Sequence, residues 1–274
     1  MAIKLPPGTA AHSTHSPPPK GRQIVTLLMI GAGLIVMVWV TLGFVFNHLI
    51  QWIPPGVERQ LGRSAIATFE QLAEPSPTQD SLNQLLDRLE AELPPDLRQE
   101  REYQLLYVPE ETVNALALPG DYIVIFEGLL AQATSENEVM MVLGHELGHF
   151  AHRDHLRGLG RSLVVRVVLS VLFGDGGSLA AWGLETFTQT HFSRQQETRA
   201  DEFGLTLLQR TYGHVAGATD FFDRLSQQTG VTFDLFTTHP APRKRVQRLE
   251  QLIQQRQYEL GAITPLPPSL QVGE

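Results

Sequence analysis

Residues 24–46 form an uninterrupted apolar run, IVTLLMIGAGLIVMVWVTLGFVF, in which no side chain is charged. A helix of this length is about 34 Å long, enough to cross the hydrocarbon core of a bilayer. A cleaved signal peptide is the main alternative, but its apolar core would be shorter, and FVFNHLIQWIPP contains no small-residue cleavage site. A helix buried in a protein core is the other alternative. We predict a transmembrane signal anchor over residues 24–46.

The basic residues on either side of this run predict its orientation. Lys4, Lys20 and Arg22 precede it, and the next basic side chain is Arg59. The positive-inside rule then places the N-terminus in the cytoplasm and the bulk of the chain outside it, in a periplasmic or lumenal space. Residues 1–23 are rich in Pro, Ser and Thr, which predicts a disordered tail.

Composition narrows the chemistry that the chain can carry out. The 274 residues include no cysteine, so disulfides, thiolate metal sites and cysteine nucleophiles are excluded. Any bound metal must be held by histidine and carboxylate side chains. The net charge of −8 argues against nucleic acid as a partner.

The rest of the chain is predicted to be mainly helical, with a small antiparallel β-sheet. Leucines at helical spacing and several prolines predict a helical juxtamembrane segment over residues 47–100. QLLYVP and DYIVIFEGLL have the composition of short strands around the loop ETVNALALPG. The apolar run 162–177 is interrupted by Arg166, and it either packs in the core or lies at the membrane interface. The C-terminal residues 259–274 are predicted to be disordered.

The stretch EVMMVLGHELGHFAHRDH, residues 138–155, contains the pattern HExxH in an apolar helix. His145 and His149 are one helical turn apart on one face, so both imidazoles can reach one zinc ion at about 2.0–2.1 Å. Glu146 lies beside the first ligand and can act as the general base of a zinc-dependent hydrolase. His152 and His155 fit a polar helix end better than a ligand role.

A catalytic zinc keeps a third protein ligand, and two residues compete for this position. His155 has the spacing of a metzincin ligand, but His152 stands where those enzymes have a glycine, so the helix is expected to continue and carry His155 away. Glu197 lies on a later helix, four residues before Asp201 and on the same face. We predict that Glu197 binds the metal while Asp201 orients a ligand imidazole.

Three segments together resemble the membrane-associated gluzincin metalloproteases, which include the HtpX, BepA-like and mitochondrial inner-membrane stress proteases. These segments are the HExxH stretch, SRQQETRADEFG and HPAPRKRV, within a resemblance that covers roughly residues 55–255. The resemblance implies a zincin-like α+β catalytic domain, assigned to residues 101–258. It implies one Zn²⁺ with ligands His145, His149 and Glu197, with Glu146 as base and Asp201 as orienting partner. It further implies that His239 stabilises the oxyanion and that Arg243 lies close to the cleft.

The same resemblance predicts where a substrate binds. Residues 114–120, beginning with Asn114, are similar to the family segment that leads into the edge strand beside the substrate. Asp121 stands where the family often has a second glycine. We expect a substrate to add a strand along residues 122–126, with Tyr122, Ile123 and Val124 in contact with it.

The predicted function is that of a membrane-anchored zinc endopeptidase in protein quality control. Its substrates would be misfolded or misassembled membrane and envelope proteins, cut by a zinc-activated water with Glu146 as base. Membrane lipid would contact the chain through its N-terminal span, and no nucleic acid is expected. The alternative is a chaperone or assembly factor with a latent or structural zinc site. A resting state in which residues 239–243 block the open zinc position also remains compatible with the sequence.

Overall fold

Strand β3 (Tyr122–Phe126) lies at the centre of a three-stranded sheet. The computed structural model describes residues 21–73, 75–160, 162, 192–228, 233–239 and 242–272. β1 (Gln104–Val108) runs parallel to β3 on one side, and β2 (Ala115–Leu118) runs antiparallel to it on the other. The small sheet is therefore present but mixed rather than wholly antiparallel. The reason is topological: β3 turns back from β2 and inserts between β2 and β1, so it runs in the direction of β1.

The prediction that residues 122–126 form an edge strand is wrong. Both sides of β3 are paired with neighbouring strands, so it has no free edge for a substrate. The edges belong to β1 and β2, and β2 lies within the segment that the sequence predicted as a loop. Its sequence, ALAL, lacks the β-branched and aromatic residues that indicate a strand.

The turn between β2 and β3 explains the departure at Asp121. Gly120 and Asp121 both have positive φ angles, 86° and 69°. Aspartate is among the non-glycine residues that tolerate this conformation. The Asp121 carboxylate also accepts a hydrogen bond from the buried guanidinium of Arg101, and its carbonyl accepts one from Gln104 N at 2.8 Å. The turn is therefore held without a second glycine.

Helices surround the sheet, and the mainly helical fold class is confirmed. They are, in chain order, α1 (Gly21–Leu49), η1 (Ile50–Trp52), α2 (Pro55–Leu72), α3 (Pro77–Glu90), α4 (Pro95–Glu100), α5 (Glu127–Gln132), α6 (Glu136–Ala151), α9 (Arg194–Tyr212), α10 (Asp220–Gln227), α11 (Asp234–Thr238), α12 (Pro242–Arg256) and η2 (Pro268–Leu270). Residues 154–160 are also helical.

The two faces of the sheet are covered by different helices. Successive side chains of a strand point to opposite faces, and both sets along β3 are apolar. Ile123 and Ile125 belong to the core that includes α3, α6 and α9. Val124 and Phe126 pack in a second cluster with side chains of α2. Helices α2 and α3, predicted as part of a separate juxtamembrane segment, therefore pack on the same sheet as α6.

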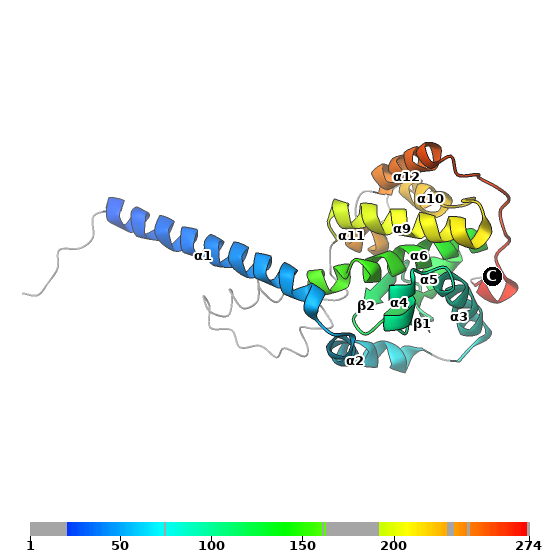
Figure 1. The fold of residues 1–274 in the computed structure, drawn as a ribbon, viewed down its shortest axis with the longest axis horizontal. Coiled ribbons are helices and arrows are strands. Elements are labelled where there is room, and N and C mark those ends of the chain that lie inside the picture. The colour runs from blue at the N-terminus through cyan, green and yellow to red at the C-terminus, as the bar shows by residue number, and fades with distance from the viewer. Residues whose placement is uncertain are drawn as a thin grey trace, which may run out of the picture. The chain divides into compact units, whose positions relative to one another are not determined.

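Helix α6 lies between the sheet and α9, and the contact between these two helices is unusually close (Figure 1). A Cβ atom on Gly148 would lie 2.7 Å from Cα of Ala200, and one on Gly204 would lie 2.9 Å from the backbone N of His145. Side chains at either glycine would force the helices apart. This close contact brings residues of α6 and α9 within reach of one metal ion.

The chain divides into two compact units, and the boundary lies between Leu42 and Gly43. Among the described residues, one helical stretch, Gly21–Trp52, is long and apolar enough to cross a membrane. The tail predicted for residues 1–23 falls mostly outside the described residues, and so does the apolar run predicted at 162–177.

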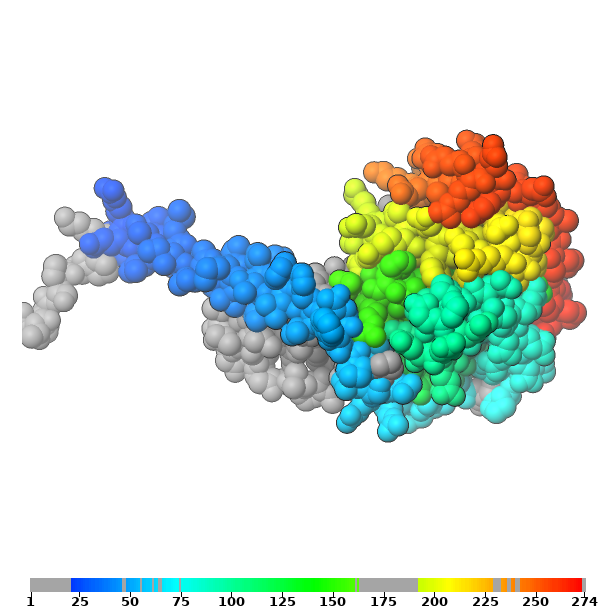
Figure 2. Space-filling view, in the orientation of Figure 1, coloured from blue at the N-terminus to red at the C-terminus, as the bar shows by residue number. Residues whose placement is uncertain are grey.

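The prediction of a disordered C-terminal segment is wrong for residues 259–272. Pro265 forms an isolated antiparallel bridge with Ser135, and the carbonyl of Thr264 accepts a hydrogen bond from Glu136 N at 3.1 Å. Leu266 and Leu270 are buried. In Figure 2 this segment, in red, borders the surfaces of α9 and α3. The Pro-rich composition of the segment predicted disorder, but two of its leucines pack in the core.

Candidate metal centre

Helix boundaries place the residues of the HExxH pattern and its partners. Ser135 caps the N-terminus of α6, accepting a hydrogen bond from Glu138 N, and the helix continues through His149 to Ala151. Ser193 and Gln196 form a capping box at the start of α9, which places Glu197 in its first turn. His239 directly follows α11.

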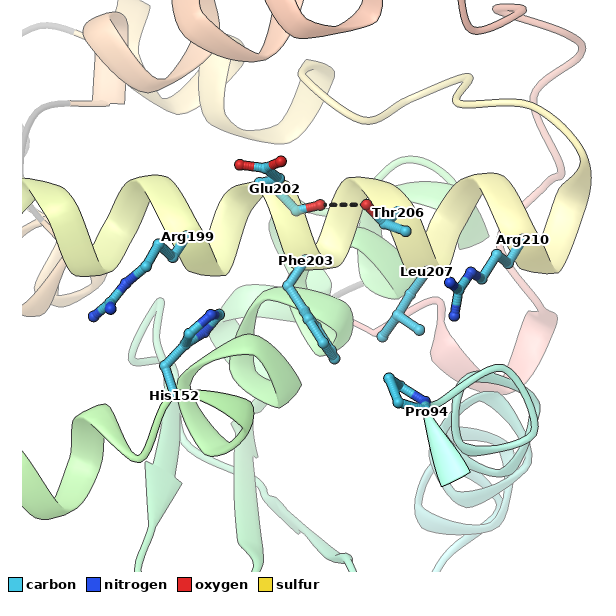
Figure 3. Close-up of a pocket in the computed structure, with 8 residues that line it drawn as sticks. All are labelled: Pro94, His152, Arg199, Glu202, Phe203, Thr206, Leu207 and Arg210. Atoms are coloured by element: carbon cyan, nitrogen blue, oxygen red, sulfur yellow. Dashed lines mark hydrogen bonds between the residues drawn. The ribbon is translucent and has the colours of Figure 1, made fainter. Parts of the chain in front are cut away.

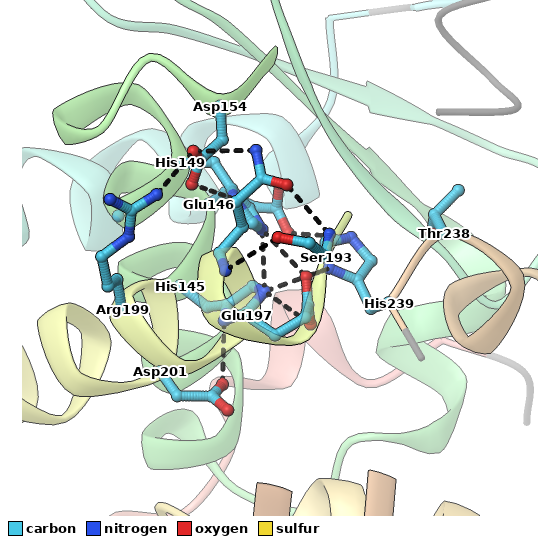
Figure 4. A network of polar contacts seen from close by, with 12 residues as sticks. His145, Glu146, His149, Asp154, Ser193, Glu197, Arg199, Asp201, Thr238 and His239 are labelled. Atoms are coloured by element: carbon cyan, nitrogen blue, oxygen red, sulfur yellow. Dashed lines mark hydrogen bonds and ion pairs between the residues drawn. The ribbon is translucent and has the colours of Figure 1, made fainter. Parts of the chain in front are cut away.

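Four side chains converge on one point. Ligand atoms of His145, His149, Glu197 and His239 all lie within 4.8 Å of one another (Figure 4). His145 Nε2 lies 3.1 Å from His149 Nε2 and 3.1 Å from His239 Nδ1. Glu197 Oε1 lies 3.1 Å from His239 Nδ1 and 3.5 Å from His149 Nε2. All four residues are buried.

This arrangement fits a zinc ion. Four ligand atoms at 2.0–2.1 Å from a tetrahedral centre lie about 3.3 Å apart, close to the separations seen here. Three imidazole nitrogens that face one another are poorly satisfied without a shared cation, because each would direct a lone pair or a proton at the next. Three nitrogens and a carboxylate oxygen are also donors that zinc prefers.

The outer ring nitrogens of the two α6 histidines each meet a carboxylate. His145 Nδ1 lies 3.0 Å from Asp201 Oδ1, and His149 Nδ1 lies 3.3 Å from Asp154 Oδ2. A histidine that donates its Nδ1–H to a carboxylate presents Nε2 as a lone-pair donor. Both Nε2 atoms point into the cluster. The spacing of Asp201 from Glu197 predicted its contact with a ligand imidazole, whereas the contact of Asp154 with His149 was not predicted from the sequence.

A sharp turn after α6 brings Asp154 back to the site. The helix ends at Ala151, Arg153 takes a positive φ of 54°, and helical structure resumes over 154–160. The expectation that the helix continues past His152 is therefore wrong, although no glycine makes the turn. His155 still does not reach the cluster, because its Nε2 contacts Glu58 at 2.6 Å.

The structure brings Arg245, rather than Arg243, to the centre. Arg243 is exposed and donates to the carbonyl of Ser226 at 3.4 Å. Arg245, two residues along α12, is buried, 2.6 Å from Asp201 Oδ1 and 3.0 Å from Glu197 Oε2. Positions two apart on a helix do not share a face, so one of these arginines faces α9 and the other faces solvent. The run PRKR gave no indication of which one.

The charges of these groups compensate one another in the buried centre. Burial would raise the pKa of Glu197, but the charges of His239 and Arg245 hold it well below its usual range. Burial would lower the pKa of His149, yet hydrogen bonds to Asp154 and Glu197 raise it to about 9. The pKa of His145 is lowered by burial and by Arg245. The carboxylates are thus kept in the ionised form that binds a cation.

Glu146 lies beside the cluster, and no donor among the described residues binds its carboxylate. It is fully buried, and neither of its oxygens makes a hydrogen bond within the described part of the chain. Its Oε1 lies 3.8 Å from His239 Nε2. A buried carboxylate without a donor is costly unless it has another task, and a position beside a metal site is suited to proton transfer.

The residues predicted to bind substrate lie in the sheet and are not brought into the cluster. Ile123 and Val124 are core residues of β3, and Tyr122 packs against the α2 side. Asn114 is buried, and its Oδ1 accepts a hydrogen bond from Ala115 N at 2.9 Å. Of these four residues, Asn114 directly precedes the edge strand β2 in the chain, and the other three belong to the central strand β3.

A separate pocket of about 300 Å³ lies along α9 (Figure 3). Its lining includes His152, Arg199, Phe203 and Pro94, but none of the four converging residues. A second pocket, of about 250 Å³, is lined in part by Glu197, Asp201 and Arg245. The first pocket is therefore not part of the metal centre, and the second reaches its α9 side.

Comparison with known proteins identifies the family of this chain and several relatives. The family model described as "Peptidase family M48" matches residues 77–253. Mitochondrial metalloendopeptidase OMA1 of Arabidopsis thaliana is 34% identical over 151 residues, which are 54% of this chain and 31% of that protein. Metalloprotease LoiP of Escherichia coli is 33% identical over 145 residues, 50% of this chain and 57% of the relative. A putative beta-barrel assembly-enhancing protease of Vibrio cholerae is 24% identical over 160 residues, 53% and 33% of the two chains.

The matched part thus spans between 31% and 57% of the length of these relatives. The family model covers more than half of this chain, including the HExxH helix, Glu197 and His239. The chain belongs to peptidase family M48.

Proposed function

We propose that this chain is a membrane-anchored zinc endopeptidase. The observation that carries the proposal is the convergence of His145, His149 and Glu197 beside the uncommitted carboxylate of Glu146. Relatives named as metalloendopeptidases support the same activity. The apolar helix α1 supports attachment to a membrane, with the N-terminus in the cytoplasm by the positive-inside rule.

Each side chain then has a role in peptide hydrolysis. His145, His149 and Glu197 would hold the zinc, with Asp201 and Asp154 fixing the orientation of the imidazoles. Zinc supplies Lewis acidity, which lowers the pKa of a coordinated water toward about 7. Glu146 accepts a proton from the attacking water and returns it to the amine of the leaving group.

We propose that His239 moves before a substrate enters. In the described arrangement its Nδ1 lies 3.1 Å from both His145 Nε2 and Glu197 Oε1, where a fourth ligand would be. We propose that this arrangement is a closed state. If His239 withdrew, water and substrate could approach the residues that would hold the zinc, and the His239 imidazole could then stabilise the oxyanion.

Substrate is proposed to pair with β2 instead of β3. Asn114 O accepts a hydrogen bond from Phe126 N, so in the antiparallel ladder Leu116 also directs its backbone groups toward β3. Of the alternate residues, Ala117 directs its backbone groups away from the sheet, whereas Ala115 N, which also points away from β3, already donates to Asn114 Oδ1 at 2.9 Å. A peptide added at this edge would be held mainly by its backbone, which tolerates many sequences. Misfolded or misassembled membrane and envelope proteins are substrates of this kind.

A metal-exchange experiment on the full chain in detergent tests the proposal. A chelator should abolish cleavage of an unfolded reporter protein, and added Zn²⁺ should restore it. Mass spectrometry of the products should show internal peptide bonds cut. If the zinc-loaded chain instead suppresses aggregation of the reporter without cutting it, the alternative of a chaperone with a latent zinc site is correct.

A further inference from the structure

Three consecutive residues of the turn after α6 make contacts in two directions. Arg153 and His155 reach the segment that follows α1, whereas Asp154 between them reaches the metal centre. The turn therefore lies between the membrane-proximal part of the chain and a proposed zinc ligand.

The Arg153 side chain binds backbone carbonyls at the start of this segment. Its Nη1 donates to the carbonyl of Ile50 at 2.8 Å and to that of Ile53 at 2.7 Å. These carbonyls belong to the first residue of η1 and to the residue that follows it, and a guanidinium is well suited to hold a pair of acceptors in fixed geometry. Ile50 itself is buried. Any displacement of residues 50–53 would therefore pull on Arg153.

His155 holds the next part of the segment through a buried ion network. Its Nε2 lies 2.6 Å from Glu58 Oε1 on α2, and Glu58 also accepts from Arg101 at 3.2 Å. Arg101 in turn binds Asp121 of the β2–β3 turn. All four side chains are buried. Removing one partner from such a network is costly, because the others remain charged away from water, so this contact is not readily given up.

Asp154 connects the turn to the metal centre. Its Oδ2 meets His149 Nδ1 at 3.3 Å, and its Oδ1 accepts hydrogen bonds from Gln196 at 2.9 Å and Arg199 at 3.2 Å. Because Asp154 adjoins both Arg153 and His155 in the chain, its position follows theirs. If the contacts of Arg153 and His155 with the segment were lost, Asp154 would be held less firmly, but Gln196 and Arg199 would still bind its carboxylate.

We propose that Arg153, His155 and Glu58 are positioning residues that make zinc binding depend on the segment 50–58 directly after the apolar helix. The inference rests on the proposed zinc site. With the segment docked, Asp154 holds His149 in the orientation that binds metal. With the segment displaced, Asp154 moves, His149 is held less firmly, and zinc affinity falls. The state of the chain next to its membrane anchor is in this way transmitted to the catalytic centre.

The test compares zinc affinity among variants of the full chain, by competition with a chromogenic chelator. The release variant is Arg153→Gln/Glu58→Gln. The matched control is Arg63→Gln/Glu70→Gln, which makes the same chemical changes at exposed positions of α2. We expect the control to bind zinc as the wild type does. The release variant should bind at least about threefold more weakly, a part of the ~10–100-fold that loss of such an orienting partner costs.

A double-mutant comparison separates this route from general destabilisation. Asp154→Asn alone should weaken zinc binding, and adding the release substitutions to it should weaken it no further. Unchanged affinity in the release variant, or a full additional loss on top of Asp154→Asn, would overturn the inference. Thermal unfolding of the metal-free proteins reports folding, and Glu58→Gln alone replaces the release variant if that does not fold. A wild-type chain that binds no zinc would instead refute the proposed function.

Discussion

Asp154 Oδ2 lies 3.3 Å from His149 Nδ1, although the helix that carries His149 ends three residues before Asp154. The left-handed conformation of Arg153 turns the chain back and makes this contact possible. It is the counterpart of the 3.0 Å contact between Asp201 and His145. The two histidines of HExxH are therefore oriented by carboxylates from different parts of the chain, one local and one from α9.

Loss of Asp201 should weaken metal binding. We expect Asp201→Ala to lower zinc affinity by about 10–100-fold, because His145 loses the acceptor that fixes its tautomer and Arg245 loses a partner. Asp220→Ala, at an exposed position of α10, is the control. Zinc content after dialysis against a metal buffer measures the difference, and equal retention by the two variants would contradict the role given to Asp201.

Arg243 and Arg245 should contribute very differently to the free energy of unfolding. Arg245→Met leaves Glu197 and Asp201 buried without their cation, and breaking such a pair costs about 3–5 kcal/mol. Arg243→Met changes an exposed side chain, and its effect on the free energy of unfolding should stay within about 0.5 kcal/mol. Denaturant unfolding of both variants decides the matter. Similar losses of stability would show that α12 is oriented differently.

The close approach of α6 and α9 should not tolerate a methyl group. Gly204→Ala would place a Cβ 2.9 Å from the backbone N of His145 and 3.1 Å from the carbonyl carbon of Gly144. We expect a loss of about 1–3 kcal/mol in unfolding free energy, the usual cost of overpacking, together with weaker zinc binding. Gly56→Ala, which meets no atom within 4 Å, is the control: it should leave zinc binding unchanged and should not lower the unfolding free energy, because alanine is the better helix former.

The ion network around Glu58 predicts a defined pH dependence of stability. Burial would raise the pKa of Glu58, but His155 and Arg101 outweigh it and lower the pKa from 4.5 to about 2. A depressed carboxyl pKa stabilises the fold fully above the unfolded value and loses this contribution as pH falls toward the folded value. The difference in Tm between wild type and Glu58→Gln should therefore shrink as pH falls below about 5.

Thermal unfolding between pH 2 and pH 7 measures this difference, with Glu70→Gln as the control for a glutamate at an exposed position of the same helix. A Tm difference that does not change across this window would show that the ionised form of Glu58 is not what the network stabilises.

Local patterns predicted the parts of the site that lie on helices. HExxH and the spacing of Glu197 and Asp201 follow helical geometry, and the structure places these residues on two adjoining helices. The apolar helix and the strands β1 and β3 were equally visible from length and composition. Residues 259–272 were misread because their anchoring leucines are sparse among polar and proline residues.

Long-range and irregular features were not readable in the same way. Strand order depends on where β2 pairs, and ALAL has no strand signature. Asp154 reaches His149 only because a non-glycine residue adopts a left-handed turn. The choice between Arg243 and Arg245 depends on how α12 is rotated against α9, which follows from tertiary packing.

The proposed role of Glu146 as the base of a zinc peptidase can be tested with the full chain in detergent with zinc. Wild type and Glu146→Gln are compared for cleavage of an unfolded reporter protein and for zinc bound per chain. Glu146 is not among the four converging ligands, so both proteins should bind one zinc, and only the wild type should cleave. Cleavage by Glu146→Gln at the wild-type rate would show that Glu146 is not the base, and zinc-loaded wild type that does not cleave the reporter would show that the chain is not a peptidase.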